Sequence, residues 1–182
     1  LAKRLDDDLS RVRLLTRYTD GDAPLPEGGK NVKASWQRFQ KESRTNWGLM
    51  IREAVADRIV PNGITIAGSA DSPKAKQAQR IWRDNRMDTV FKNWVRFGLT
   101  TNQSFLTLFL DDARARIAAD SQETMCVSTD PLQPWRVRAA LKVFRDLDAE
   151  KDFAFVWVDG ARQKFYRDCY TGNTAKRRLL RL

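Results

Sequence analysis

Histidine is absent from the chain, and its only two cysteines, Cys126 and Cys169, lie far apart in the sequence. Without histidine there can be no Ser-His-Asp or Cys-His relay, no histidine-ligated metal cluster and no imidazole switch near neutral pH. The cysteines form no C-x-x-C pair, which excludes zinc ribbons and thioredoxin-like redox chemistry. Two lone thiols favour a reducing compartment, and a disulfide between them stays an open alternative.

Other signatures of chemistry are missing as well. Neither G-x-x-x-x-G-K-[ST] nor G-x-G-x-x-G occurs, so the phosphate-binding loops that these motifs build are absent. The one tight carboxylate pair at a predicted strand end, Asp111-Asp112, is explained by a hairpin tip, whereas a two-metal nuclease needs carboxylates from several elements. We therefore expect no catalytic residue, no cofactor and no metal site, and we predict that the chain is not an enzyme.

Long apolar runs are also lacking, and none approaches the ~20 residues of a transmembrane helix, so we expect no membrane partner. What the chain does have is positive charge: 33 Lys and Arg against 23 Asp and Glu in 182 residues, a formal net charge of +10. Arginine outnumbers lysine, which suits ion pairs at protein interfaces as well as phosphate contacts. The charge is spread along the chain up to the basic segment 173–182, which we interpret as a helix start or a disordered tail.

Hydrophobic periodicity predicts helices in the first half of the chain. The predicted helices span residues 3–17, about 31–44 and about 46–59, with a loop rich in glycine and proline at 18–29. The 46–59 segment has the cleanest amphipathic pattern, which predicts that one stripe lies buried against a sheet. The members of that stripe are Trp47, Met50, Ile51, Val55 and Ile59.

The pattern then predicts a short strand at 64–67 and a helix that begins at the cap Ser72-Pro73. This helix breaks near Asn85-Arg86, and a further helix reaches Gly98, after which the apolar period changes from helical to alternating. Strands are predicted at 103–110, 113–118, 125–128, 136–145, 152–158 and 162–167, the last two joined by Asp159-Gly160. Helices followed by strands predict an α+β fold, with N-terminal helices packed on a mostly antiparallel β-sheet.

The aromatic residues support two interpretations. Trp36, Trp47, Trp82 and Trp94 fall on apolar helical stripes, which favours core packing. Stacking on nucleic-acid bases would need aromatic residues beside basic ones on an exposed strand. The segment that comes closest is Lys164-Phe165-Tyr166-Arg167, although a hairpin strand with a polar outer face explains it equally well.

Several short motifs follow one another over about residues 3–168. They are the charged first helix, Tyr18-Thr19-Asp20-Gly21-Asp22, Pro24-Leu25-Pro26, the helix opened by Asn46-Trp47, the strand at 63–66, Trp82-Arg83-Asp84-Asn85-Arg86-Met87-Asp88, Gly98 with Ser104-Phe105, and the strand at 138–145. In this order they resemble the N-terminal wing region of portal proteins of tailed double-stranded DNA bacteriophages, of the siphophage type common in actinobacteriophages. Residues 99–103 make one junction longer than in that family, so its turn is not carried over.

The resemblance implies a single portal wing-like domain over 1–182, with a helical part at about 1–98, a β-rich part at about 103–168 and a basic tail at 173–182. The stem, clip and crown of a portal would lie outside these residues. Portal subunits are far longer and residue 1 is leucine, so we expect a shortened expression product, a proteolysed fragment or a truncated prophage copy.

The function implied is structural: a head–tail connector at one capsid vertex of the virion, in the host cytoplasm during assembly, through which double-stranded DNA is packaged and ejected. The implied partners are other portal subunits in a dodecameric ring, capsid and scaffold proteins, the terminase, the head–tail adaptor and the DNA in the channel. The alternative is a basic nucleic-acid-binding module without enzymatic activity.

Overall fold

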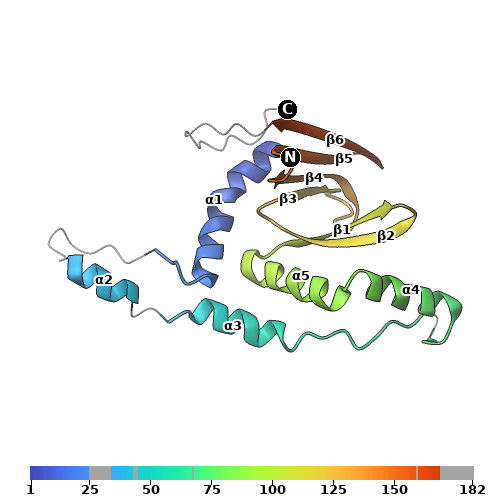
Figure 1. Ribbon diagram of the computed structural model, residues 1–182, viewed down its shortest axis with the longest axis horizontal. Coiled ribbons are helices and arrows are strands. Elements are labelled where there is room, and N and C mark those ends of the chain that lie inside the picture. The colour runs from blue at the N-terminus through green and yellow to red at the C-terminus, as the bar shows by residue number, and fades with distance from the viewer. Residues whose placement is uncertain (25–33, 43–44, 67, 159, 169–182) are drawn as a thin grey trace. The chain divides into compact units, whose positions relative to one another are not determined.

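A computed structural model describes residues 1–24, 34–42, 45–66, 68–158 and 160–168 (Figure 1). The helices come first along the chain: α1 (Ala2–Thr19), α2 (Ala34–Glu42), α3 (Trp47–Ala56), α4 (Pro73–Asp84) and α5 (Met87–Thr101). The strands follow: β1 (Ser104–Asp111), β2 (Arg114–Ser121), β3 (Met125–Thr129), β4 (Val137–Asp146), β5 (Lys151–Val158) and β6 (Ala161–Asp168). They form two antiparallel sheets, β1-β2 and β3-β4-β5-β6, so the predicted α+β class is confirmed.

The chain divides into two compact units. One consists of Leu1–Val12 and Asp120–Leu182, and the other of Arg13–Ala119. Helix α1 and strand β2 each begin in one unit and end in the other. The portal wing-like domain expected over 1–182 stays a prediction.

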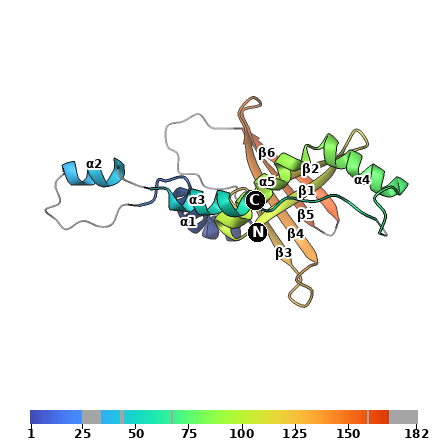
Figure 2. The same cartoon turned by 90° about the horizontal axis from the view of Figure 1, so that it is seen from below.

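The first unit is built on the four-stranded sheet, whose strands lie side by side from β3 to β6 in Figure 2. One face of this sheet is covered by the beginning of α1, where Leu5 is 1% exposed and packs on Cys126, Leu141 and Ala154. Burial raises the pKa of the Cys126 thiol, which keeps it protonated and unreactive. The predicted helix at 3–17 is therefore confirmed, and its apolar residues Leu5, Leu9 and Val12 are buried.

The second unit confirms the predicted helix signals around α4. Ser72 caps α4 by accepting a hydrogen bond from the Ala75 backbone N–H at 3.2 Å, and Pro73 occupies the first helical position. The break before α5 falls at Asn85-Arg86, with Arg86 at φ 50°. Helix α5 does not end near Gly98 but continues to Thr101, because Asn102 at φ 69° supplies a left-handed cap.

Two predicted elements need correction. The strand predicted at 64–67 is wrong for the residues described there: only Ile66 pairs, with Ser69 in a single bridge, because Gly68 at φ 75° turns the chain back at once. Helix α3 ends at Ala56 rather than near residue 59. Cys169, the tail at 173–182 and parts of the predicted loop at 18–29 and helix at 31–44 lie outside the described residues.

Both predicted hairpin tips are confirmed. Asp112 and Ala113 connect β1 to β2 with φ angles of 46° and 61°, the left-handed pair that a tight two-residue turn requires. This position explains Asp111-Asp112 as part of a turn. At the second tip Val158 pairs with Ala161, and Gly160 has φ 79°.

Gly48 provides a test of how α3 is attached. A Cβ at this position would lie 2.8 Å from the Tyr18 carbonyl oxygen of α1. Although Gly→Ala inside a helix normally stabilises by about 0.5–1 kcal/mol, we expect Gly48→Ala to lower the free energy of unfolding by about 1–3 kcal/mol, as overpacking does. Denaturant melts measure the change.

Gly98→Ala is the matched control, because the only close contact of its Cβ within 3.4 Å among the described residues would be the Ser104 hydroxyl, at 3.0 Å, and a side-chain hydroxyl can rotate away. We expect this substitution to be neutral or stabilising. A Gly48→Ala variant as stable as Gly98→Ala would contradict the close approach of α3 to α1.

Candidate functional site

Helix α3 contacts α5 through charged side chains. The Glu53 carboxylate accepts hydrogen bonds from Arg96 Nε of α5 at 2.9 Å and from its neighbour Arg52 Nε at 3.0 Å. One turn further on, Asp57 pairs with Lys92 of α5. Ala56, which is only 2% exposed, lies between these pairs in the sequence and allows a close approach. The side of α3 that faces the protein is therefore mainly polar.

The start of α3 is fixed by Asn46. Its Oδ1 accepts a hydrogen bond from the Leu49 backbone N–H at 2.9 Å, which caps the helix, and its Nδ2 donates to the Thr19 carbonyl at 2.8 Å. The predicted Asn46-Trp47 helix start is confirmed. One amide side chain thus sets both where α3 begins and where it joins the end of α1.

The ion pairs change the pKa values of both carboxyl groups. The hydrogen bond from Arg96 lowers the pKa of Glu53, against an opposing effect of desolvation, and Lys92 lowers the pKa of Asp57. A lowered pKa in the folded state contributes stability above the unfolded pKa, and this stability is lost as the pH falls through the folded value. The attachment of α3 is therefore strongest near neutral pH.

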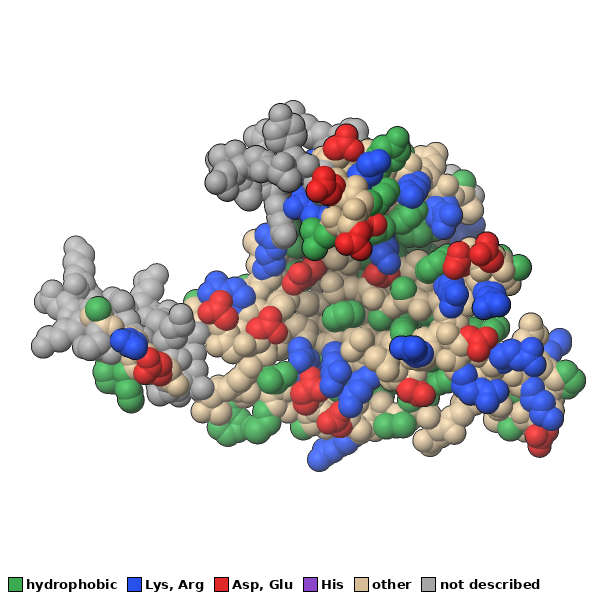
Figure 3. Space-filling model, viewed as in Figure 1, with side chains coloured by type: hydrophobic (Ala, Val, Ile, Leu, Met, Phe, Trp, Pro, Cys, Tyr) green, Lys and Arg blue, Asp and Glu red, His purple; other side chains and the backbone are tan. Residues whose placement is uncertain are grey.

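The apolar stripe of α3 faces outward, so the predicted burial of this stripe against a sheet is wrong. Its residues are Trp47 (61% exposed), Met50 (51%), Ile51 (61%), Val55 (40%) and, beyond the helix, Ile59 (43%). Figure 3 shows hydrophobic side chains exposed along the part of the surface where Figure 1 places α3. Hydrophobic periodicity shows that a helix has an apolar face. It does not show that the opposite, polar face forms ion pairs with another helix, here α5.

The tryptophans divide between core and surface. Trp82 and Trp94 are half-buried, and both rings contact Phe91, with centroids 6.2 and 5.5 Å from it, as core packing predicts. Trp36 is 52% exposed and stacks on Phe39, 56% exposed, at 5.5 Å. The core assignment is therefore wrong for Trp36 and Trp47.

The segment from Trp82 to Asp88 connects the break between α4 and α5 to strand β2 through side-chain hydrogen bonds; we call it the joint. Trp82 Nε1 donates to Asp88 Oδ1 at 2.9 Å. Asn85 Nδ2 donates to the carbonyl of Ala115 at 2.9 Å, and its Oδ1 accepts from the backbone N–H of Ile117 at 2.9 Å, which ties the helix break to strand β2. Sequence analysis did not anticipate this contact, because a lone asparagine at a helix end carries no sign of its partner.

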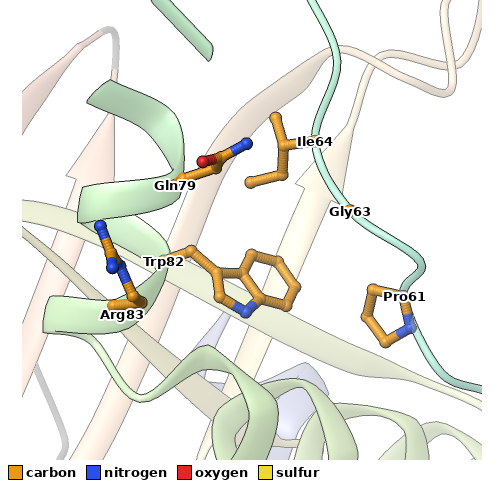
Figure 4. Close-up of a pocket in the computed structure, with 6 residues that line it drawn as sticks. All are labelled: Pro61, Gly63, Ile64, Gln79, Trp82 and Arg83. Atoms are coloured by element: carbon orange, nitrogen blue, oxygen red, sulfur yellow. The ribbon is translucent and has the colours of Figure 1, made fainter. Parts of the chain in front are cut away.

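A hollow of about 270 Å³ lies beside this joint. Figure 4 shows the Trp82 indole extending from α4 toward the segment that carries Pro61, Gly63 and Ile64. Gln79 and Arg83 are the polar side chains of its lining. The volume falls below the ~300–1,000 Å³ of typical small-molecule sites, so we assign no ligand to it.

The remaining candidate residues do not converge. Lys164 and Tyr166 lie on one face of β6, whereas Phe165 and Arg167 lie on the other, so the four do not form one surface. Asp111 forms an ion pair with Arg116 at 3.5 Å. Within the described part of the chain, no group of three or more His, Cys, Asp or Glu side chains is placed to hold a metal ion. None of the helices among these residues has both the length and the apolarity to cross a bilayer.

Comparison with known proteins adds no assignment: no protein-family model matches the chain, and no curated protein matches it. The resemblance to portal proteins therefore depends on the order of the sequence motifs alone.

The outward stripe of α3 generates a stability prediction. Trp47→Ala is expected to change the free energy of unfolding by less than about 1 kcal/mol, as is usual for exposed positions. Leu141→Ala, at a side chain only 2% exposed, is expected to lower it by about 2–5 kcal/mol. Denaturant melts compare the two variants, and a loss from Trp47→Ala as large as that from Leu141→Ala would show that the stripe is buried.

The Glu53 ion pairs generate a pH prediction. Glu53→Gln is expected to lower the free energy of unfolding by about 1 kcal/mol at pH ~7, because it removes a partly buried charged partner of two arginines. The difference from the unchanged protein should shrink as the pH falls below the ordinary glutamate pKa of about 4.3, and it should vanish only below the lowered pKa of folded Glu53, where the carboxylate of the unchanged protein is protonated too. Urea melts at several pH values measure this difference.

Asp7→Asn, at an exposed position of α1, is the control for charge removal alone. We expect it to leave the acid dependence of stability unchanged. A Glu53→Gln variant that keeps the full acid dependence would exclude Glu53 as the group that holds α3.

Proposed function

We propose that this chain is a structural part of a phage portal, the ring at one capsid vertex through which double-stranded DNA is packaged and ejected. The order of motifs over about residues 3–168 is the basis of the proposal. In this role the chain carries out no chemistry. Its partners are neighbouring portal subunits, capsid and scaffold proteins, the terminase and the head–tail adaptor.

The observation that carries the proposal is that the motif residues serve as joints between elements. Asn46 connects α3 to the end of α1, and Asn85 connects the α4–α5 break to β2. Residues that fix the path of the backbone, rather than presenting reactive groups, fit a protein whose task is mechanical.

The exposed stripe of α3 supports the same role. A contiguous row of large apolar side chains on a protein surface is typical of a region that another protein covers. Subunits of a closed ring meet through heterologous contacts, in which two different surface patches face each other. In this proposal the α3 stripe is one of the two patches.

The assembly state tests the proposal. The 182-residue chain alone is expected to be a monomer or a weak oligomer at micromolar concentration. Without the stem helices, two copies would share only a small lateral interface, and interfaces below about 1,000 Å² are usually weak. A net charge of +10 on each copy also causes repulsion between them. A longer form that includes the stem helices of a portal is expected to form a closed ring of about a dozen subunits. Light scattering of both forms measures this difference.

Ile51→Asp combined with Val55→Asp, on the outward stripe, is expected to weaken the ring of the longer form. Arg80→Asp, on an exposed position of α4, is the control and should leave the ring intact. A strictly monomeric longer form would overturn the portal assignment, and a ring unaffected by the paired substitutions would remove α3 from the interface.

A further inference from the structure

The four-stranded sheet has a second face, opposite the one that α1 covers. Strand pairing arranges its side chains in rows across β4, β5 and β6. The rows are Phe144–Phe153–Tyr166, Lys142–Phe155–Lys164 and Ala140–Trp157–Arg162. We call the aromatic and charged members of these rows the aromatic–basic face. Antiparallel sheets usually have one polar, solvated face, so this concentration of rings on the second face needs an explanation.

The rings form one continuous patch. The Phe153 ring centroid lies 5.5 Å from that of Phe144 and 6.5 Å from that of Tyr166, and Phe155 lies 5.9 Å from Trp157. Tyr166 is 65% exposed, Phe144 is 36% exposed, and every residue of β6 is exposed. The outer rings are thus accessible while the inner ones support them.

Cations lie directly on this patch. Lys164 Nζ is 4.5 Å from the Phe153 ring centroid, and Arg162 Cζ is 5.5 Å from that of Phe155.

Two carboxylates near this face have partners of their own. Asp120 pairs with Lys142 at 2.7 Å, and Asp146 Oδ1 accepts hydrogen bonds from the backbone N–H groups of Asp148 and Ala149. Among the described residues, Arg162 and Lys164 form no ion pair with a carboxylate, so their charges are available to a ligand.

We propose that the aromatic–basic face binds single-stranded nucleic acid. Unpaired bases stack on exposed aromatic rings, and arginine and lysine contact the phosphates between them. A four-stranded antiparallel sheet with aromatic side chains on its open face is a geometry that supports this mode of binding. In it, bases stack on Tyr166 and on the Phe144–Phe153 pair, and phosphates lie near Arg162 and Lys164. A duplex hides the flat faces of its bases and cannot use these rings. The inference does not depend on the portal assignment.

Binding to a labelled oligothymidylate of about 20 nucleotides, followed by fluorescence anisotropy, tests the proposal. Tyr166→Ala is expected to weaken binding about tenfold through lost stacking. Arg162→Gln with Lys164→Gln is expected to reduce the slope of log K against log salt by about 1.4, or about 0.7 for each phosphate contact. Lys74→Gln with Arg80→Gln, on exposed positions of α4, removes the same charge elsewhere and should leave the slope nearly unchanged.

Three ligands separate stacking from simple charge attraction. An abasic strand of the same length keeps the phosphates but lacks bases, and we expect it to bind at least tenfold more weakly. A duplex of the same sequence and a polyglutamate chain should also bind more weakly. Equal binding of the abasic strand, the duplex or polyglutamate would overturn the proposal, as would the absence of oligothymidylate binding at about 50 mM salt. Equal losses in the α4 control and the β6 variants would overturn it as well.

Discussion

The Glu53 carboxylate, held by Arg52 and Arg96, determines which side of α3 faces the rest of its unit. Carboxylates placed against α5 require cationic partners there, and Arg96 provides one for Glu53 and Lys92 one for Asp57. Gly48 and Ala56 then allow the helix to approach closely. Because the polar side is turned inward, the apolar side is left on the surface. The exposed stripe and its proposed role in assembly both follow from this orientation.

The elements of the fold were largely predictable because their signals are local. Leu5, Leu9 and Val12 mark the buried side of α1, Ser72-Pro73 marks the start of α4, and Asp159-Gly160 marks the β5–β6 connection. The errors concern which other helix or strand each element packs against. Trp47 has the same helical spacing whether its side is turned inward or outward, and residues 64–67 have β-forming composition but lack a neighbouring strand among the described residues. The contact of Asn85 with β2 could not be predicted from the sequence for the same reason, since its partners lie about thirty residues further along the chain.

Two surfaces result, and their chemistry differs. The α3 stripe is mainly apolar, which fits a protein partner that removes it from water. The aromatic–basic face of β4, β5 and β6 combines rings with available cations, which fits a ligand with flat faces and negative charge. The α3 stripe and the aromatic–basic face belong to different units of the chain and share no residue, so either surface assignment can fail without the other.

The outward orientation of α3 is the central claim, and the three methionines of the chain report on it directly. Met50 of α3 is 51% exposed, whereas Met87 and Met125 are 4% and 6% exposed. Oxidation of a methionine by hydrogen peroxide depends on access to its sulfur. Mass spectrometry of the peroxide-treated native chain should therefore find Met50 oxidised many times faster than Met87 and Met125, and all three at similar rates after unfolding. Protection of Met50 equal to that of Met87 in the native monomer would show that the stripe faces inward and would contradict the account.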